Sequence, residues 1–166
     1  MNVDLYSGLV FLHVASAFAF AAGHGVSVFV AFQLRREREP ARMAALLDLS
    51  AASLAMAIVG LLVLLATGIA TGIMGGFFGR GWIWLSLLLL IAIGGLMTPL
   101  GKNHFGRIRE VVGPQPGASD ANGPDAVVST ADQLPALLAT RRPELLAGIG
   151  GAGFLVILWL MMFKPF

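Results

Sequence analysis

The chain contains no cysteine, and charged residues make up only 12% of its 166 residues. Without a thiol there is no disulfide framework, no thiolate metal site, no iron–sulfur cluster and no cysteine nucleophile. Hydrophobic residues make up 57% of the chain and its mean hydropathy is +0.84, so one soluble core could not bury all the apolar side chains. The sequence therefore predicts a protein that is solvated by lipid.

Acidic residues are missing from the four long apolar stretches, which cover residues 5–34, 51–74, 82–100 and 145–163. Each stretch is long enough to cross a membrane as a helix, although the third is barely so. The predicted fold is therefore all-α: one domain, residues 1–166, forming an up-down four-helix bundle in a bacterial inner (plasma) membrane. Because no carboxylate lies in a span to orient a histidine base or to carry protons, hydrolysis, ion pumping and coupled transport are disfavoured.

Basic residues are distributed unequally between the two sides of the predicted bundle. Cytoplasmic connections collect lysine and arginine, so the richer side should face inward and both termini should lie outside. The formal charge of +2 does not indicate nucleic acid as a partner, because these residues flank apolar segments as membrane anchors do. Nine basic residues lie in the two inner connections, against Arg80 and Lys164 on the other side: Arg35, Arg36, Arg38, Arg42, Lys102, Arg107, Arg109, Arg141 and Arg142.

The connections differ in composition. Residues 41–49 form an amphipathic segment that we expect to lie at the interface before the second span. Pro99 should break or kink the third span. The inner connection 103–142 is predicted to be flexible, because residues 113–125 contain three prolines and three glycines with almost no apolar side chain. Residues 127–142 regain leucines and suggest a helix on the membrane surface.

Glycine is abundant and recurs at helical spacing within the spans. Where a glycine replaces a larger side chain, two membrane helices can approach closely and pack by dispersion. The alternative is that the glycines line a pore or a binding cleft. The glycines expected to pack are Gly23, Gly25, Gly68, Gly72, Gly76 and Gly148.

Two of the three histidines, His13 and His24, lie in the first span. They are 11 residues apart, which places them about 20° apart on one helical face but roughly 16.5 Å apart along the axis, too far to share one metal. Each could ligate haem b or copper with a methionine, and Met56 and Met97 are the candidates. A shared His24–Met97 site would require the third helix to shift inward or unwind. We therefore favour packing histidines that hydrogen-bond to serine or threonine on a neighbouring helix.

Several weak motifs together resemble a family of bacterial predicted integral membrane proteins of unknown function. They are the Leu12-His13 pair, the charged run 35–38, the end of the third span at 94–99 and the terminal segment 159–165. More distantly, Leu12-His13 is similar to the copper-resistance D membrane proteins and to the HemJ-type protoporphyrinogen oxidases, which bind haem. The latter resemblance implies a haem-ligand position at His13. The rest of that family's pattern has no clear match here, so oxidase activity is not implied.

These observations predict an accessory or assembly protein that binds other membrane helices, or a second copy of itself, within the lipid bilayer. No catalytic residue is assigned. The alternative is a membrane redox protein that binds haem b or copper through the first-helix histidines. A simple observation distinguishes the two hypotheses, because only the redox protein would purify with a Soret band or with bound metal.

Overall fold

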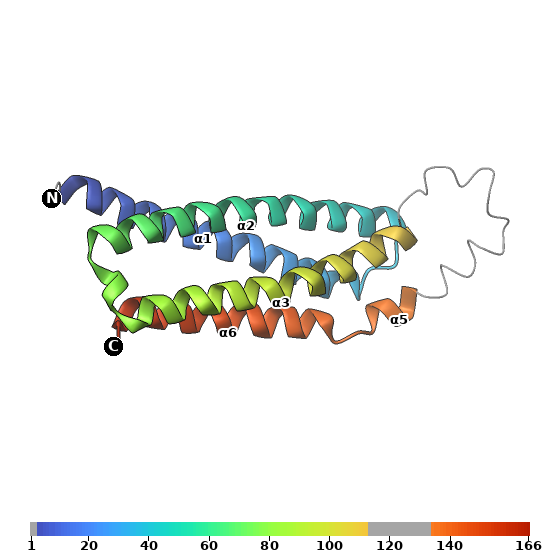
Figure 1. Ribbon diagram of the computed structural model, residues 1–166. Coiled ribbons are helices and arrows are strands. Elements are labelled where there is room, and N and C mark those ends of the chain that lie inside the picture. Colours follow the sequence, from blue (N-terminus) through green and yellow to red (C-terminus); the bar gives the residue numbers. More distant parts are fainter. Residues whose placement is uncertain (1–2, 113–133) are drawn as a thin grey trace.

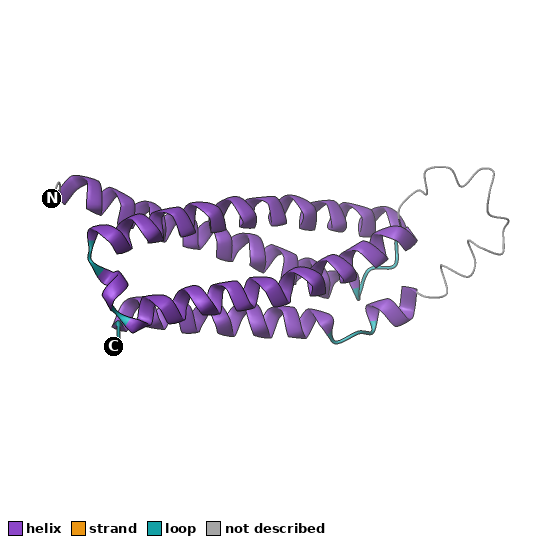
Figure 2. Ribbon diagram, in the orientation of Figure 1, coloured by secondary structure: helices purple, strands orange, loops and turns teal. Residues whose placement is uncertain are grey.

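Four long helices dominate the computed structural model, which describes residues 3–112 and 134–166. They are α1 (Val3–Leu34), α2 (Pro40–Met74), α3 (Gly81–Val112) and α6 (Arg142–Phe163). The 3-10 turn η1 (Phe77–Gly79) joins α2 to α3, and the short helix α5 (Leu134–Leu138) precedes α6. The helices run side by side with both ends of the chain at one end of the bundle, and the described part contains no strand (Figures 1 and 2). The predicted all-α fold with four long helices is confirmed.

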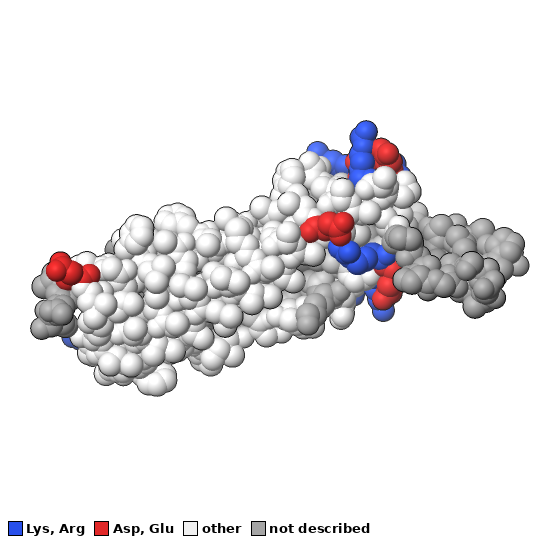
Figure 3. Space-filling model, turned by 90° about the horizontal axis from the view of Figure 1, so that it is seen from above, with Lys and Arg blue, Asp and Glu red and all other residues white. Residues whose placement is uncertain are grey.

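All four long helices are long and apolar enough to cross a membrane. Their outer surfaces carry large apolar side chains that are exposed in the isolated chain, including Phe18, Leu62 and Leu155. Most charged side chains gather at the end of the bundle opposite the chain termini (Figure 3). The face seen in Figure 3 is thus uncharged along most of the bundle, with most of its charged side chains at one end.

Helices α1 and α2 form a close pair, because the glycines at their contact points have no side chains to hold the two backbones apart. A Cβ atom at Gly23 of α1 would lie 2.6 Å from the backbone oxygen of Ser53 on α2. A Cβ at Gly60 of α2 would lie 2.8 Å from the backbone nitrogen of Phe20 on α1. Close approach of backbones increases the dispersion contacts that hold membrane helices together. Gly23 and Gly60 are therefore two points at which the backbones of α1 and α2 approach closely.

Helices α3 and α6 form the second pair (Figure 1). At Gly153 of α6 the missing side chain makes room for Ile93 of α3, whose Cγ1 lies 3.1 Å from the Cβ position. Near the chain termini, Leu160 of α6 is buried with Trp82 and Ile83 of α3. The bundle is therefore two helix pairs placed against each other.

At the charged end, a cluster of buried apolar side chains ties the two pairs together. Its members come from α1, α2, α3 and α5, so it is the place where most elements meet. The buried residues are Val30, Leu34, Met43, Leu47, Ile108 and Leu138.

Two helix boundaries differ from the sequence prediction. Helix α2 begins at Pro40, so residues 41–49 are its first turns rather than a separate interfacial segment. Proline suits this position because the first residues of a helix have no intrahelical partner for their N–H groups. Helix α3 continues to Val112, so residues 103–112 are helical and not part of a flexible connection.

Pro99 does not end α3. Proline has no N–H group and cannot bond to the carbonyl four residues earlier, but side-chain hydroxyls can support the backbone around such a gap in a membrane helix. The hydroxyl of Thr98 donates to the carbonyl oxygen of Gly94 at 2.7 Å. The carbonyl that the proline leaves without its N–H partner is that of Gly95, so the Thr98 bond lies one residue before the gap and does not replace the missing bond.

The remaining predictions on the inner connection are tested only in part. Residues 113–133 lie outside the described part of the chain, so the prediction of a flexible segment at 113–125 does too. Of the predicted surface helix at 127–142, the described residues form only α5, which covers Leu134–Leu138.

The predicted glycine series on α2 is partly wrong. Gly68 and Gly72 do pack: their Cβ positions lie 2.9 Å from the His13 imidazole and 3.0 Å from Ile83, respectively. Gly76 lies beyond the end of α2 and has open space around its Cβ position. Its backbone has φ +66°, a left-handed conformation that favours glycine, so its role is to turn the chain towards α3.

Candidate functional site

His13 is a hydrogen-bonded packing residue between α1 and α2. Its Nδ1 atom lies 3.0 Å from the carbonyl oxygen of Leu64 and 3.2 Å from the Thr67 hydroxyl oxygen. A carbonyl oxygen only accepts, so Nδ1 carries the proton and donates it to α2. The Thr67 hydroxyl itself donates to the Val63 carbonyl at 2.6 Å. The polar group of His13 is thereby satisfied, in the manner that the packing interpretation expects.

His24 is different, because its buried Nε2 atom has no hydrogen-bond partner among the described residues. The expected hydrogen bond to a serine or threonine of a neighbouring helix is therefore not found at this nitrogen. Ser27 and Ser53, which lie close in sequence or across the helix pair, are engaged elsewhere. The two serine hydroxyls bond to each other at 2.9 Å, and Ser53 also donates to the Ser50 carbonyl. The imidazole instead faces α6, where its Cε1 lies 2.6 Å from the position that a Cβ of Gly150 would occupy.

Met97 of α3 meets the same glycine. Its terminal methyl carbon lies 3.0 Å from the Cβ position of Gly150. Side chains from α1 and α3 therefore converge on one point of α6, which we call the His24–Gly150–Met97 junction. Gly150 makes this possible because any larger residue would fill the place that the two side chains occupy.

The junction forms without the shift or unwinding of the third helix that the sequence analysis required. That requirement came from ending the third span near residue 100, which placed Met97 near the inner surface. Because α3 continues to Val112, Met97 lies 15 residues before the end of its helix and His24 lies 10 residues before the end of α1. At 1.5 Å per residue these are depths of roughly 22 Å and 15 Å, close enough for long side chains on tilted helices to meet.

The other candidate residues lie apart from the junction. Met56 is on the outer face of α2, with 43% of its surface exposed. Gly25 and Gly148 have nothing within 4 Å of their Cβ positions, so they pack against no other helix of the described chain. His104 is buried near the charged end and stacks edge-on against Phe105.

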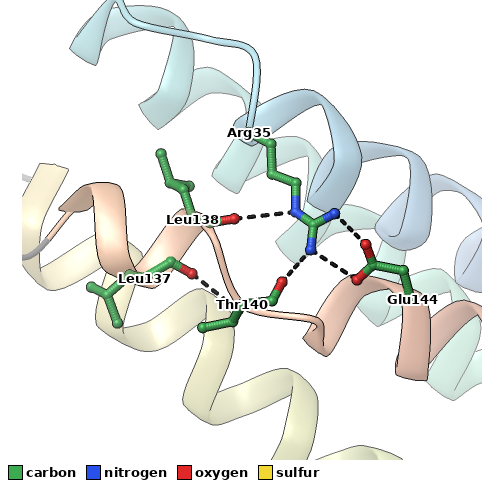
Figure 4. Close-up of polar contacts among 5 residues, drawn as sticks. All are labelled: Arg35, Leu137, Leu138, Thr140 and Glu144. Atoms are coloured by element: carbon green, nitrogen blue, oxygen red, sulfur yellow. Dashed lines mark hydrogen bonds and ion pairs between the residues drawn. The ribbon is translucent and has the colours of Figure 1, made fainter.

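A second polar centre, which sequence reasoning missed, lies at the charged end (Figure 4). The guanidinium of Arg35 donates to the two carboxylate oxygens of Glu144 at 2.5 and 2.8 Å. It also donates to the carbonyl oxygens of Leu138, at 3.1 Å, and Thr140. We call these contacts the Arg35 latch. They join the end of α1 to the start of α6, and the bond to Glu144 raises the pKa of Arg35.

The signal for the latch in the sequence was weak, because Arg35 stands in a mixed-charge run of the kind that is normally solvated. Its only distinction is that it directly follows the last residue of α1. The latch is a structural contact whose donors and acceptors are paired with one another, whereas the junction holds an unpaired nitrogen and a thioether.

Comparisons with protein-family models, with curated proteins and with solved structures find no match to this chain.

Proposed function

We propose that this chain is a multi-pass protein of the bacterial inner (plasma) membrane, where it acts as an accessory or assembly component that binds other membrane helices. The four long apolar helices and the largely uncharged face seen in Figure 3 support the membrane location. The observation that carries helix binding is a pair of small residues on the outer face of α6.

Gly148 and Ala152 are both exposed and lie four residues apart on α6, so they share one face of that helix. Leu145 and Leu155 stand on either side of them along the helix and are also exposed. The two small residues therefore leave a shallow notch between larger apolar side chains. Such small-xxx-small pairs admit the backbone of a second membrane helix, which gains dispersion contacts that lipid chains do not provide.

This interaction is testable by photo-crosslinking in native membranes. A photo-reactive amino acid at position 152 should form a covalent adduct with a second membrane helix, and Gly148→Leu should reduce that adduct several-fold by filling the notch. The same probe at Leu62, which is exposed on α2, is the matched control and should label lipid only. Mass spectrometry of the adduct distinguishes another protein from a second copy of this chain. Lipid adducts alone at position 152 would count against helix binding.

The proposed orientation places both termini outside and the charged end in the cytoplasm. It rests on the nine-to-two distribution of basic residues and on the gathering of charge at one end of the bundle (Figure 3). A reporter enzyme that is active only outside the cytoplasm, fused after Phe166, should be active. A reporter that works only in the cytoplasm should be inactive at the same site and active when inserted after Arg36. The opposite pattern would reverse the orientation.

A further inference from the structure

We propose that the His24–Gly150–Met97 junction binds one copper(I) ion, with the Nε2 atom of His24 and the sulfur atom of Met97 as its protein ligands. This goes beyond the binding of other helices and does not depend on it. Three observations carry the proposal: an unpaired nitrogen, a methionine side chain that converges on it, and a glycine whose missing side chain lets both reach the same point of α6.

The first observation is the unpaired nitrogen. Among the buried side-chain nitrogen and oxygen atoms of the described residues, only His24 Nε2 has no hydrogen-bond partner. An unsatisfied polar atom in an apolar interior is destabilising, so membrane proteins rarely retain one without a use. His13, on the same helix, shows how this bundle satisfies an imidazole that serves only in packing. A metal ion at Nε2 would satisfy His24 in a comparable way.

The second observation is the type of ligand that lies beside this nitrogen. Met97 has a flexible side chain whose methyl carbon already reaches Gly150, so rotation about its bonds can turn the sulfur towards Nε2. Thioether sulfur is a soft ligand that selects copper(I), and imidazole also binds copper. Hard cations need several carboxylates, and within residues 3–112 and 134–166 no three His, Asp or Glu side chains come together.

The third observation, the close approach of α6, favours a single ion over haem b. The imidazole edge lies against the backbone of α6 at Gly150, with Cε1 2.6 Å from the Cβ position of that glycine. A porphyrin whose iron was bound by Nε2 would need the place that this helix occupies. A single ion occupies far less space than a porphyrin, and because the Nε2 atom of His24 is the atom nearest to the Gly150 Cβ position, binding requires the His24 and Met97 side chains to move apart at the glycine.

The test uses the purified full-length chain in detergent, titrated with copper(I) under anaerobic reducing conditions against a chromophoric copper(I) chelator. We expect one tightly bound copper(I) per chain. Met97→Leu and His24→Asn should each weaken binding by at least about tenfold, the smallest loss seen when even an outer-shell partner of a metal ligand is removed. The matched controls are Met56→Leu, on the outer face of α2, and His13→Asn, which retains an amide donor for the Leu64 carbonyl.

X-ray absorption of the copper-loaded protein should show nitrogen and sulfur neighbours, and the sulfur neighbour should disappear in Met97→Leu. Leucine has nearly the volume of methionine, so this variant should fold even if His24→Asn does not. Wild-type protein that binds no copper(I), or that binds it equally well after Met97→Leu, would overturn the proposal. Equal loss in the Met56→Leu control would show binding to methionines in general, and would also overturn it.

Discussion

Gly23→Leu is expected to separate α1 from α2 and to produce the largest loss of stability of any single substitution considered. A Cβ at this position would lie 2.6 Å from the Ser53 carbonyl oxygen and 2.9 Å from the Ala57 backbone nitrogen. These are backbone atoms of α2, so they cannot rotate away as a side chain would. We expect a cost of about 3 kcal/mol, the upper part of the usual range for overpacking.

The matched control is Gly25→Leu, which makes the same substitution two residues further along the same helix. Nothing lies within 4 Å of the Gly25 Cβ position, so this variant should be as stable as the wild type or slightly more stable. At roughly 2–4 °C per kcal/mol for a chain of this size, thermal unfolding in detergent should separate the two variants by about 6–12 °C. Equal melting temperatures would mean that α1 and α2 are not packed as closely as the contacts of Gly23 require.

Arg35→Ala is expected to release the start of α6 from the end of α1. The substitution removes four hydrogen-bond donations, to Glu144, Leu138 and Thr140, and leaves their acceptors to water. A hydrogen bond to a charged group contributes about 1.5–3 kcal/mol, whereas an exposed ion pair contributes about 1 kcal/mol or less. The Arg35 side chain is only 24% exposed and that of Glu144 is 49% exposed, so we expect a net cost of about 2 kcal/mol.

Limited trypsin digestion provides a local measurement, because Arg141 lies in the segment that the latch holds. Cleavage after Arg141 should become several-fold faster in Arg35→Ala. Arg36→Ala, which removes the exposed neighbouring arginine, should leave that cleavage rate unchanged. If both variants are cleaved at the wild-type rate, the latch does not hold α6 in solution.

The number and approximate position of the helices could be predicted from the sequence, because the bilayer requires long uninterrupted apolar segments and these are visible in composition alone. Which helices pair with one another could not be predicted from the sequence. Lipid chains are as apolar as the helices, so pairing depends on the shape of the two surfaces, and spacing does not reveal shape. Gly23 and Gly25 illustrate the difficulty: both flank His24 and looked equivalent, yet only Gly23 touches α2.

The candidate site was predicted only in its separate parts. His24 and Met97 were both identified as possible ligands, but the apparent end of the third span at Pro99 placed them at different depths. The 12 residues from 101 to 112, about three turns of helix, contain too many polar side chains for hydropathy to mark them as part of the span, so the continuation of α3 to Val112 was missed. Gly150 likewise stands among several glycines of the last span, and only the contacts of His24 and Met97 at its Cβ position distinguish it from them.

The two helix pairs also differ in the order in which their members are synthesised. Helices α1 and α2 are consecutive, so their contacts can form as soon as Met74 has entered the membrane. Helix α3 pairs with α6, which follows only after residues 113–133 and α5 have been made. At about 5–20 residues per second, α3 waits several seconds for its partner with Ile93, which packs at Gly153 of α6, uncovered. A ribosome that stalls in this interval would leave a complete α1–α2 hairpin joined to a solitary α3, the form of this chain that is most open to wrong partners and to membrane proteases.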